Sequence, residues 1–241
     1  MSTAPGAARP SRGVRLTLLA AALAVFAVLL GLGVWQVQRL FWKLELIATV
    51  ETRLSATPVA APAPAEWAAL TAGAAEYRRV TVSGHYAEGP QRRVKAVTVR
   101  GPGFWVMTPL ISDAGWPVLV SRGFVPDGTP EIAAPAGPVR VSGLLRMSQP
   151  KGAFLRRNDP QAGRWFSRDT AAIGADLGLS GIAPYFIDAE AGPDPEALPI
   201  GGLTVVRFRN THLAYAATWF ALAALWAGWL IYLRRSRKAA D

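Results

Sequence analysis

Two long apolar runs lie near the two ends of the chain. The first, Leu16–Gln38, has 23 residues without a formal charge, and the second, Asn210–Leu233, has 24. At about 1.5 Å of rise per residue, either run would form a helix roughly 35 Å long, against a hydrocarbon core of about 30 Å. Aromatic residues stand at the end of each run, as at a membrane interface. The pattern therefore predicts transmembrane helices over residues 16–38 and 210–233.

The first helix is expected to continue beyond its apolar run. No Gly or Pro occurs from Gln36 to Ser55, where apolar residues recur near helical spacing, and Pro58 then interrupts the pattern. The basic start and apolar middle also fit a cleaved signal peptide. The apolar run is longer than in signal peptides, however, and no clear small-residue cleavage site accompanies it. This favours a retained anchor whose helix extends to about residue 55.

Residues 57–203 follow a different pattern, in which apolar and polar residues alternate with a period of two. Turn sequences such as Asp113-Ala114-Gly115 separate the runs, and short helices are expected near residues 66–71 and 169–177. The pattern predicts a β-rich, largely antiparallel domain, so the whole chain is expected to be an α+β membrane protein. The strand-like runs are residues 79–85, 93–100, 104–111, 116–124, 139–147, 185–188 and 204–209.

Small residues mark places where backbones are expected to approach closely. Gly84 interrupts an alternating strand, which indicates a close backbone contact or a bulge. In the apolar runs, small residues recur four positions apart, a spacing that allows two membrane helices to pack together. These pairs are Ala27 with Gly31, Ala217 with Ala221, and Ala224 with Gly228.

The charge distribution predicts the orientation in the membrane. Residues 1–15 and 234–241 hold 7 of the 26 basic residues and 1 of the 16 acidic ones, and so contribute +6 of the net charge of +10. By the positive-inside rule both tails are cytoplasmic, which places residues 57–203 in the periplasm. Because the excess charge lies in the tails, it indicates a membrane protein in contact with lipid, and it does not favour a nucleic acid partner.

Few residues offer catalytic chemistry. The chain has no cysteine, which excludes disulfides and thiolate metal sites, and it has three methionines and two histidines. It contains no phosphate-binding loop, no HExxH and no GxSxG sequence, and its carboxylates are scattered among turns. We therefore expect a protein that is not an enzyme. His85 falls on the polar side of its strand, opposite Val80 and Val82, and is expected to be solvated.

His212 is the candidate site residue, because it stands at the start of the second apolar run. A histidine near the end of a membrane helix is a candidate axial ligand of a haem iron. The alternative is an interfacial histidine that only forms hydrogen bonds near the membrane surface. Tyr215 and Trp219 follow at offsets of three and seven residues, on the same helical face. They are placed either to flank a flat macrocycle or to pack against a second helix.

The order and spacing of many short motifs resemble the Surfeit-locus-one family, also called the Shy family, of cytochrome c oxidase assembly factors. Each motif is weak alone, and together they extend over about 200 of the 241 residues. One departure is Ser121, where the family often has Asn before Arg-Gly. The motifs are Leu32–Arg39, Trp42-Lys43, Leu46-Ile47, Tyr77–Val80 with Gly84, Val106–Leu110, Val118–Pro126, Asn158–Pro160, Trp165, Arg168-Asp169, Pro184–Ala189, Gly201-Gly202, Arg209–Leu213, Tyr215 and Thr218–Phe220.

The resemblance, to bacterial members in particular, implies an inner-membrane protein that binds haem a and helps to insert it into subunit I of the oxidase. Haem a synthase is a further candidate partner. His212 is the residue that the resemblance implies as the ligand of the haem iron. Other cofactor-binding candidates share the same membrane boundary: Tyr215, Trp219, Trp35, Gln36, Arg39 and Arg209.

Arg39 and Arg209 are candidates to pair with haem propionates, because a guanidinium matches carboxylate geometry. Two other functions stay open at this point. One is a scaffold that stabilises immature subunit I without binding haem, and the other is a membrane enzyme that acts on haem or quinone, which the lack of a catalytic constellation disfavours.

Overall fold

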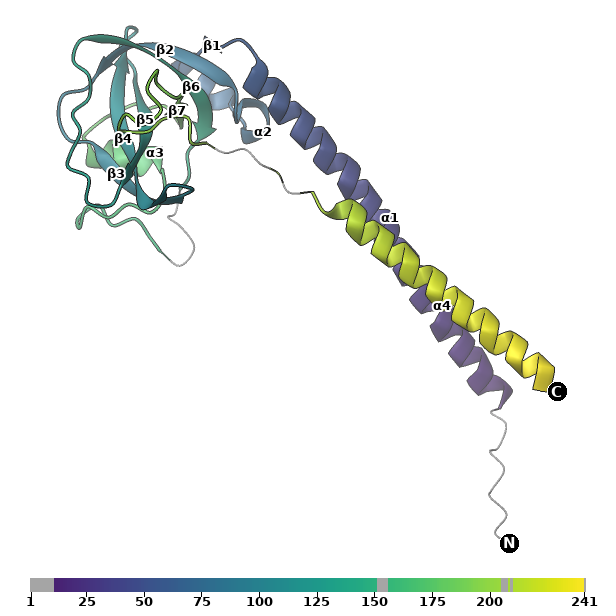
Figure 1. Cartoon of the computed structure of the whole chain (residues 1–241). Helices are drawn as coiled ribbons and strands as arrows, with labels where there is room; N and C mark the ends of the chain where they lie inside the picture. Colours follow the sequence, from purple (N-terminus) through teal and green to yellow (C-terminus); the bar gives the residue numbers. More distant parts are fainter. Residues whose placement is uncertain (1–10, 151–155, 205–207, 209, 241) are drawn as a thin grey trace. The chain divides into compact units, whose positions relative to one another are not determined.

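The chain folds into two compact units (Figure 1). The computed structural model describes residues 11–150, 156–204, 208 and 210–240. The two-helix unit comprises residues 1–48 and 207–241, and the β unit comprises residues 49–206.

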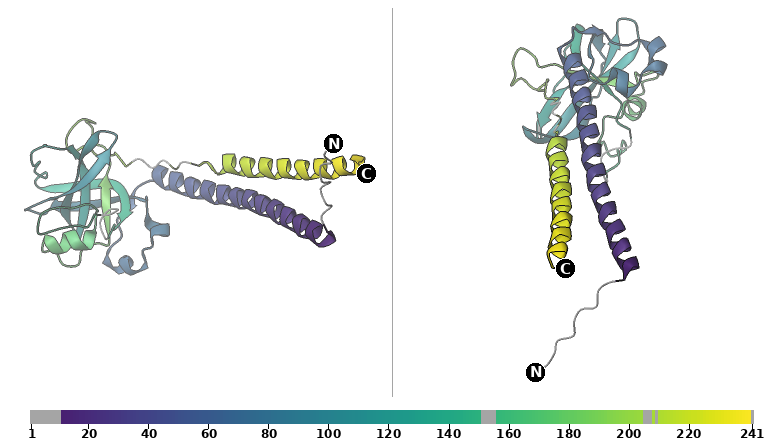
Figure 2. Two further views of the ribbon diagram at one scale, coloured as in Figure 1. Left: turned by 90° about the horizontal axis from the view of Figure 1, so that it is seen from below. Right: turned by 90° about the vertical axis from the view of Figure 1, so that its right-hand side faces the viewer.

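The two-helix unit contains most of α1 (Arg12–Ser55) and all of α4 (His212–Ala240). Both helices are long and apolar enough to cross a membrane. The two run alongside each other in both views of Figure 2. Hydrogen bonds join Ala22 to Trp226 and Gln36 to His212, so the helices are antiparallel.

The last turns of α1 belong to the β unit. The helix ends at Ser55, where the sequence analysis placed its end, and the Ser55 hydroxyl donates to the carbonyl oxygen of Glu51 at 3.0 Å. Val50 is buried, and the Arg53 guanidinium donates to the carbonyl oxygens of Gly73 and Glu76 at 2.7 and 3.0 Å. These contacts pack residues 49–55 of α1 against the rest of the β unit.

In the described part of the β unit, seven strands form the sheet, in the order β1-β2-β6-β7-β5-β4-β3. A further pairing of β2 with β4 closes five of them, β2, β6, β7, β5 and β4, into a ring, with β1 and β3 outside it. The sheet is therefore a small barrel. The strands are β1 (Val59–Ala60), β2 (Arg79–Tyr86), β3 (Arg92–Thr98), β4 (Gly101–Ser112), β5 (Pro117–Pro126), β6 (Pro138–Met147) and β7 (Tyr185–Ala189).

The sheet is mixed rather than purely antiparallel. β1 pairs with β2 in parallel, and β7 pairs with β5 in parallel, while the other pairings are antiparallel. The expectation of a β-rich domain is confirmed, and the strand-like runs correspond to β2–β7. The short strand β1 was not expected. The strand expected over residues 204–209 falls mostly outside the described residues, and Thr204 itself is not in a strand.

Among its described residues, the β unit also contains three short helical segments: η1 (Pro64–Ala69), α2 (Ala72–Ala75) and α3 (Thr170–Asp176). Asp169 caps α3 by accepting a hydrogen bond from the Ala172 N–H at 3.1 Å, which satisfies one of the unpaired donors of the first turn. α3 confirms the helix that the sequence predicts over residues 169–177.

Gly84 marks the point at which β2 changes partners. It pairs with Val139 of β6 on one side and with Ser112 of β4 on the other. A Cβ atom at this position would lie 2.1 Å from the carbonyl oxygen of Ile111, closer than any side chain can approach a backbone. The expected close backbone approach is confirmed, and it is what allows the ring of strands to close.

Candidate functional site

His212 is the first residue of α4, and its backbone is held from the preceding chain. The Asn210 side chain accepts a hydrogen bond from the His212 N–H at 3.3 Å, and the Thr211 carbonyl accepts from the Tyr215 N–H at 3.2 Å. Because the first N–H groups of a helix have no partner within it, the Asn210 contact stabilises the start of α4 at this point. The imidazole is thereby carried at the end of an apolar helix, with its side chain only partly covered.

Gln36 of α1 is the residue that the structure brings to His212. Its Oε1 atom lies 2.7 Å from Nδ1 of the imidazole, and Gln36 as a whole is 8% exposed. The contact joins two helices, and the two paired residues are 176 positions apart in the chain. Among the described residues, Nδ1 is the only ring nitrogen of His212 with a hydrogen-bond partner.

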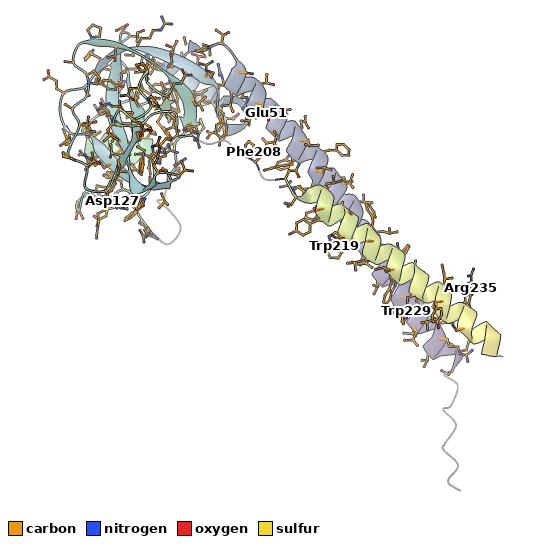
Figure 3. All side chains as sticks on the ribbon, in the orientation of Figure 1. Glu51, Asp127, Phe208, Trp219, Trp229 and Arg235 are labelled. Carbon is orange, nitrogen blue, oxygen red and sulfur yellow. The ribbon has the colours of Figure 1, made fainter. Side chains whose placement is uncertain are left out.

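Among the described residues, the other predicted site residues form no side-chain hydrogen bond with His212. Trp35 and Tyr215 are about half exposed, and Trp219, labelled in Figure 3, is half-buried. The Arg39 guanidinium lies over the ring of Trp42, 3.8 Å from the ring centroid. Arg209, the second candidate for a propionate, lies outside the described residues.

A second hydrogen bond joins the same two helices. The Trp226 indole N–H donates to the carbonyl oxygen of Ala22 at 3.0 Å. Ala22 and Gln36 are 14 residues apart in α1, and His212 and Trp226 are 14 residues apart in α4. The two contacts therefore share one antiparallel register, about 21 Å from each other at the usual helical rise. From the sequence alone, the aromatic residues of this run were expected only at a membrane interface.

The helix contact uses small residues other than those predicted. Gly31 has open space where a side chain would lie, whereas a Cβ atom at Gly33 would come within 2.6 Å of the Phe220 ring. In α4 the almost fully covered small residues are Ala216 and Ala223. The predicted role of Gly31 is therefore wrong. Two residues turn a helix by about 200°, which places Gly33 on nearly the opposite side from Gly31.

The β unit contains a hollow of its own. The hollow has a volume of about 700 Å³ and is lined mainly by the segment from Glu131 to Pro138 together with the end of β2. His85 is one of the residues that line it, and it is exposed, as the sequence predicts. Among the described residues, no three His, Cys, Asp or Glu side chains converge to hold a metal ion.

A buried charge cluster occupies the middle of the β unit. Asp188 of β7, with a side chain 5% exposed, accepts hydrogen bonds from Arg168 at 2.8 Å, Arg146 at 3.2 Å and the Thr204 hydroxyl at 2.9 Å. Arg146 also pairs with Glu76 at 2.6 Å. Burial lowers the pKa of the Arg168 guanidinium from its usual value. The cluster balances two guanidinium groups with two carboxylates, which is the arrangement of a structural network.

Comparison with known proteins shows a similarity that extends over most of the chain and includes the site. A model described as the SURF1 family matches residues 23–224, a range that includes both Gln36 and His212. The chain is 36% identical over 224 residues to "Surfeit locus protein 1" of Mus musculus, across 84% of this chain and 71% of the relative.

Two further relatives give the same result. "Surfeit locus protein 1" of Homo sapiens is 36% identical over 217 residues, across 80% of this chain and 70% of the relative. "SURF1-like protein" of Monosiga brevicollis is 35% identical over 234 residues, across 89% of this chain and 87% of the relative.

Proposed function

The chain belongs to the SURF1 family, and from this premise we propose that it assists the assembly of a haem-copper cytochrome c oxidase by binding haem a through His212. The proposed partner is subunit I of the oxidase, into which the haem is inserted. Haem a synthase is a further candidate partner, as the source of the haem. The proposed location is the inner membrane of a bacterium.

One observation carries the haem part of this proposal. His212 stands at the end of an apolar helix, its Nδ1 is engaged by Gln36 at 2.7 Å, and its Nε2 has no hydrogen-bond partner among the described residues. Histidines that ligate a metal usually hydrogen-bond through the other ring nitrogen, so this arrangement suits an axial ligand. A bound haem a would supply the iron, and this chain would supply the imidazole that coordinates it and an apolar surface.

The neighbouring residues are suited to supporting roles. Tyr215 and Trp219 lie on the same face of α4 as His212, where their rings would offer aromatic surface to a flat macrocycle. Trp35 adds an exposed aromatic ring on α1. Arg39 is an exposed cation about one helical turn after Gln36 in α1, and it could pair with a propionate by leaving the ring of Trp42.

The test is the absorption spectrum of the full chain purified from cells that make haem a. His212→Ala should insert as the wild type does, and it should lower haem affinity by about tenfold or more, because even loss of an outer-shell partner commonly costs 10–100-fold. His85→Ala is the matched control, since it removes the other histidine from an exposed strand position. It should leave the Soret band unchanged.

Two outcomes would contradict the proposal in different ways. Unchanged haem content and spectrum in His212→Ala would show that His212 is not the ligand. A wild-type chain that associates with subunit I but never carries haem would favour the scaffold function instead. The exposed apolar surface of α1 and α4 suits such docking, because few of their side chains are buried within the two-helix unit.

A further inference from the structure

We propose that Gln36 is a positioning residue that fixes the tautomer and ring orientation of His212, so that Nε2 presents its lone pair. This inference rests on the proposed haem site and adds a role to a residue that does not touch the iron. It also makes the site dependent on two helices, because the ligand comes from α4 and its positioning residue from α1.

The chemistry of the two side chains determines which nitrogen carries the proton. The amide oxygen of Gln36 can only accept a hydrogen bond, so its partner Nδ1 must donate one. A neutral imidazole carries a single N–H, which leaves Nε2 unprotonated. The nitrogen that faces away from Gln36 is therefore the one able to coordinate a metal.

Burial strengthens this assignment. Gln36 is 8% exposed, so water cannot readily replace the contact at 2.7 Å. A buried amide oxygen without a donor would lose a hydrogen bond, which disfavours the other tautomer of the imidazole. The same contact limits rotation of the ring about its χ2 angle.

Trp226 supports the contact from a distance. Its hydrogen bond to Ala22 fixes α4 against α1 at the other end of the same 14-residue register. A change of register by one residue would bring a neighbour of Gln36 opposite His212, and that neighbour points about 100° away around the helix. Trp226 is therefore a second positioning residue, which acts through the helix pair.

The test measures the tautomer of His212 in the absence of haem. The full chain in detergent, carrying His85→Gln and ¹⁵N-labelled histidine, has one imidazole, whose two ¹⁵N resonances distinguish the protonated nitrogen from the unprotonated one. We expect Nδ1 to be protonated and Nε2 to be unprotonated. Gln36→Leu, which removes the acceptor, should shift the signal towards the Nε2–H tautomer.

Three variants separate positioning from a general structural effect. Gln36→Glu keeps an acceptor oxygen and should retain the Nδ1–H tautomer. Gln38→Leu makes the same change at an exposed position two residues away and should have no effect. Trp226→Phe keeps an aromatic ring without its donor and should lower the Nδ1–H fraction.

Haem titration of the same variants links the tautomer to binding. Gln36→Leu should lower haem affinity by about 10- to 100-fold although His212 is intact, and Gln36→Glu should restore most of it. A wild-type Nε2–H tautomer, or a Gln36→Leu chain with unchanged tautomer and affinity, would overturn the positioning role. Failure of the wild type to bind haem, with an Nδ1–H tautomer that depends on Gln36, would instead overturn the proposed function.

Discussion

Gly84 is the residue at which β2 changes partners, and the space beside it admits no side chain. Gly84→Ala would bring Cβ to within 2.1 Å of the Ile111 carbonyl oxygen, so one strand must move. We expect a loss of roughly 1–3 kcal/mol in the free energy of unfolding, as for other overpacked positions. Urea unfolding of the full chain in detergent, followed by near-ultraviolet circular dichroism, measures this loss.

The control for that substitution is Gly192→Ala. Gly192 has open space around it and an ordinary backbone conformation, so we expect a change within about 0.5 kcal/mol. Equal stability of the two variants would mean that β2 and β4 do not approach at Gly84 as the structure shows.

At the site, the sequence located the residues but not their pairing. The apolar runs predicted Gln36 and His212 at the same membrane boundary, and the structure brings their side chains to 2.7 Å from each other. Their hydrogen bond depends on how each helix is rotated about its own axis. Neither apolar run specifies that rotation, since both are apolar on most sides. Because this rotation is not specified by the sequence, Gly31 rather than Gly33 was predicted to lie at the helix contact.

At the scale of elements, alternation predicted strands well and their partners poorly. β2 alternates along its whole length, and it was recognised together with Gly84. β7 is buried from Tyr185 to Asp188, so its sequence indicates a strand but not that it lies parallel to β5. β1 has only two residues, which is too short for a period of two to be detected. Strand order is set by contacts between distant segments, and a local pattern does not record them.

The cluster around Asp188 joins β6, β7 and the segments before β2 and α3, so its loss should destabilise the whole β unit. Asp188→Asn removes the charge that balances Arg146 and Arg168, whose side chains are also nearly buried. We expect a loss of about 3 kcal/mol or more in the free energy of unfolding, because an uncompensated buried charge is left behind. The urea unfolding described for Gly84 measures it.

Asp127→Asn is the matched control for this prediction. Asp127, labelled in Figure 3, pairs with Lys95 at 2.8 Å, but both side chains are well exposed to solvent. Exposed ion pairs contribute about 0–1 kcal/mol, so this variant should be close to the wild type. A stable Asp188→Asn variant would indicate that the cluster has no structural role.

At the scale of the whole molecule, helix pairing and charge together predict an orientation in the membrane. α1 and α4 are antiparallel, so if both cross the membrane, the N-terminal end of α1 and the C-terminal end of α4 lie on the same side. The structure alone does not distinguish the two sides. The basic residues that precede Leu16 and follow Leu233 predict a cytoplasmic location for both tails.

Reporter fusions test this orientation. A reporter that is active only in the periplasm should be active when inserted after Thr129, in the turn that follows β5, and inactive after Asp241. A reporter that fluoresces only in the cytoplasm should give the reverse pattern, and it serves as the control for expression of each fusion. A cytoplasmic signal at Thr129 with a periplasmic one at Asp241 would invert the topology. His212, the first residue of α4, would then face the cytoplasmic boundary, and haem would have to reach the site from that side.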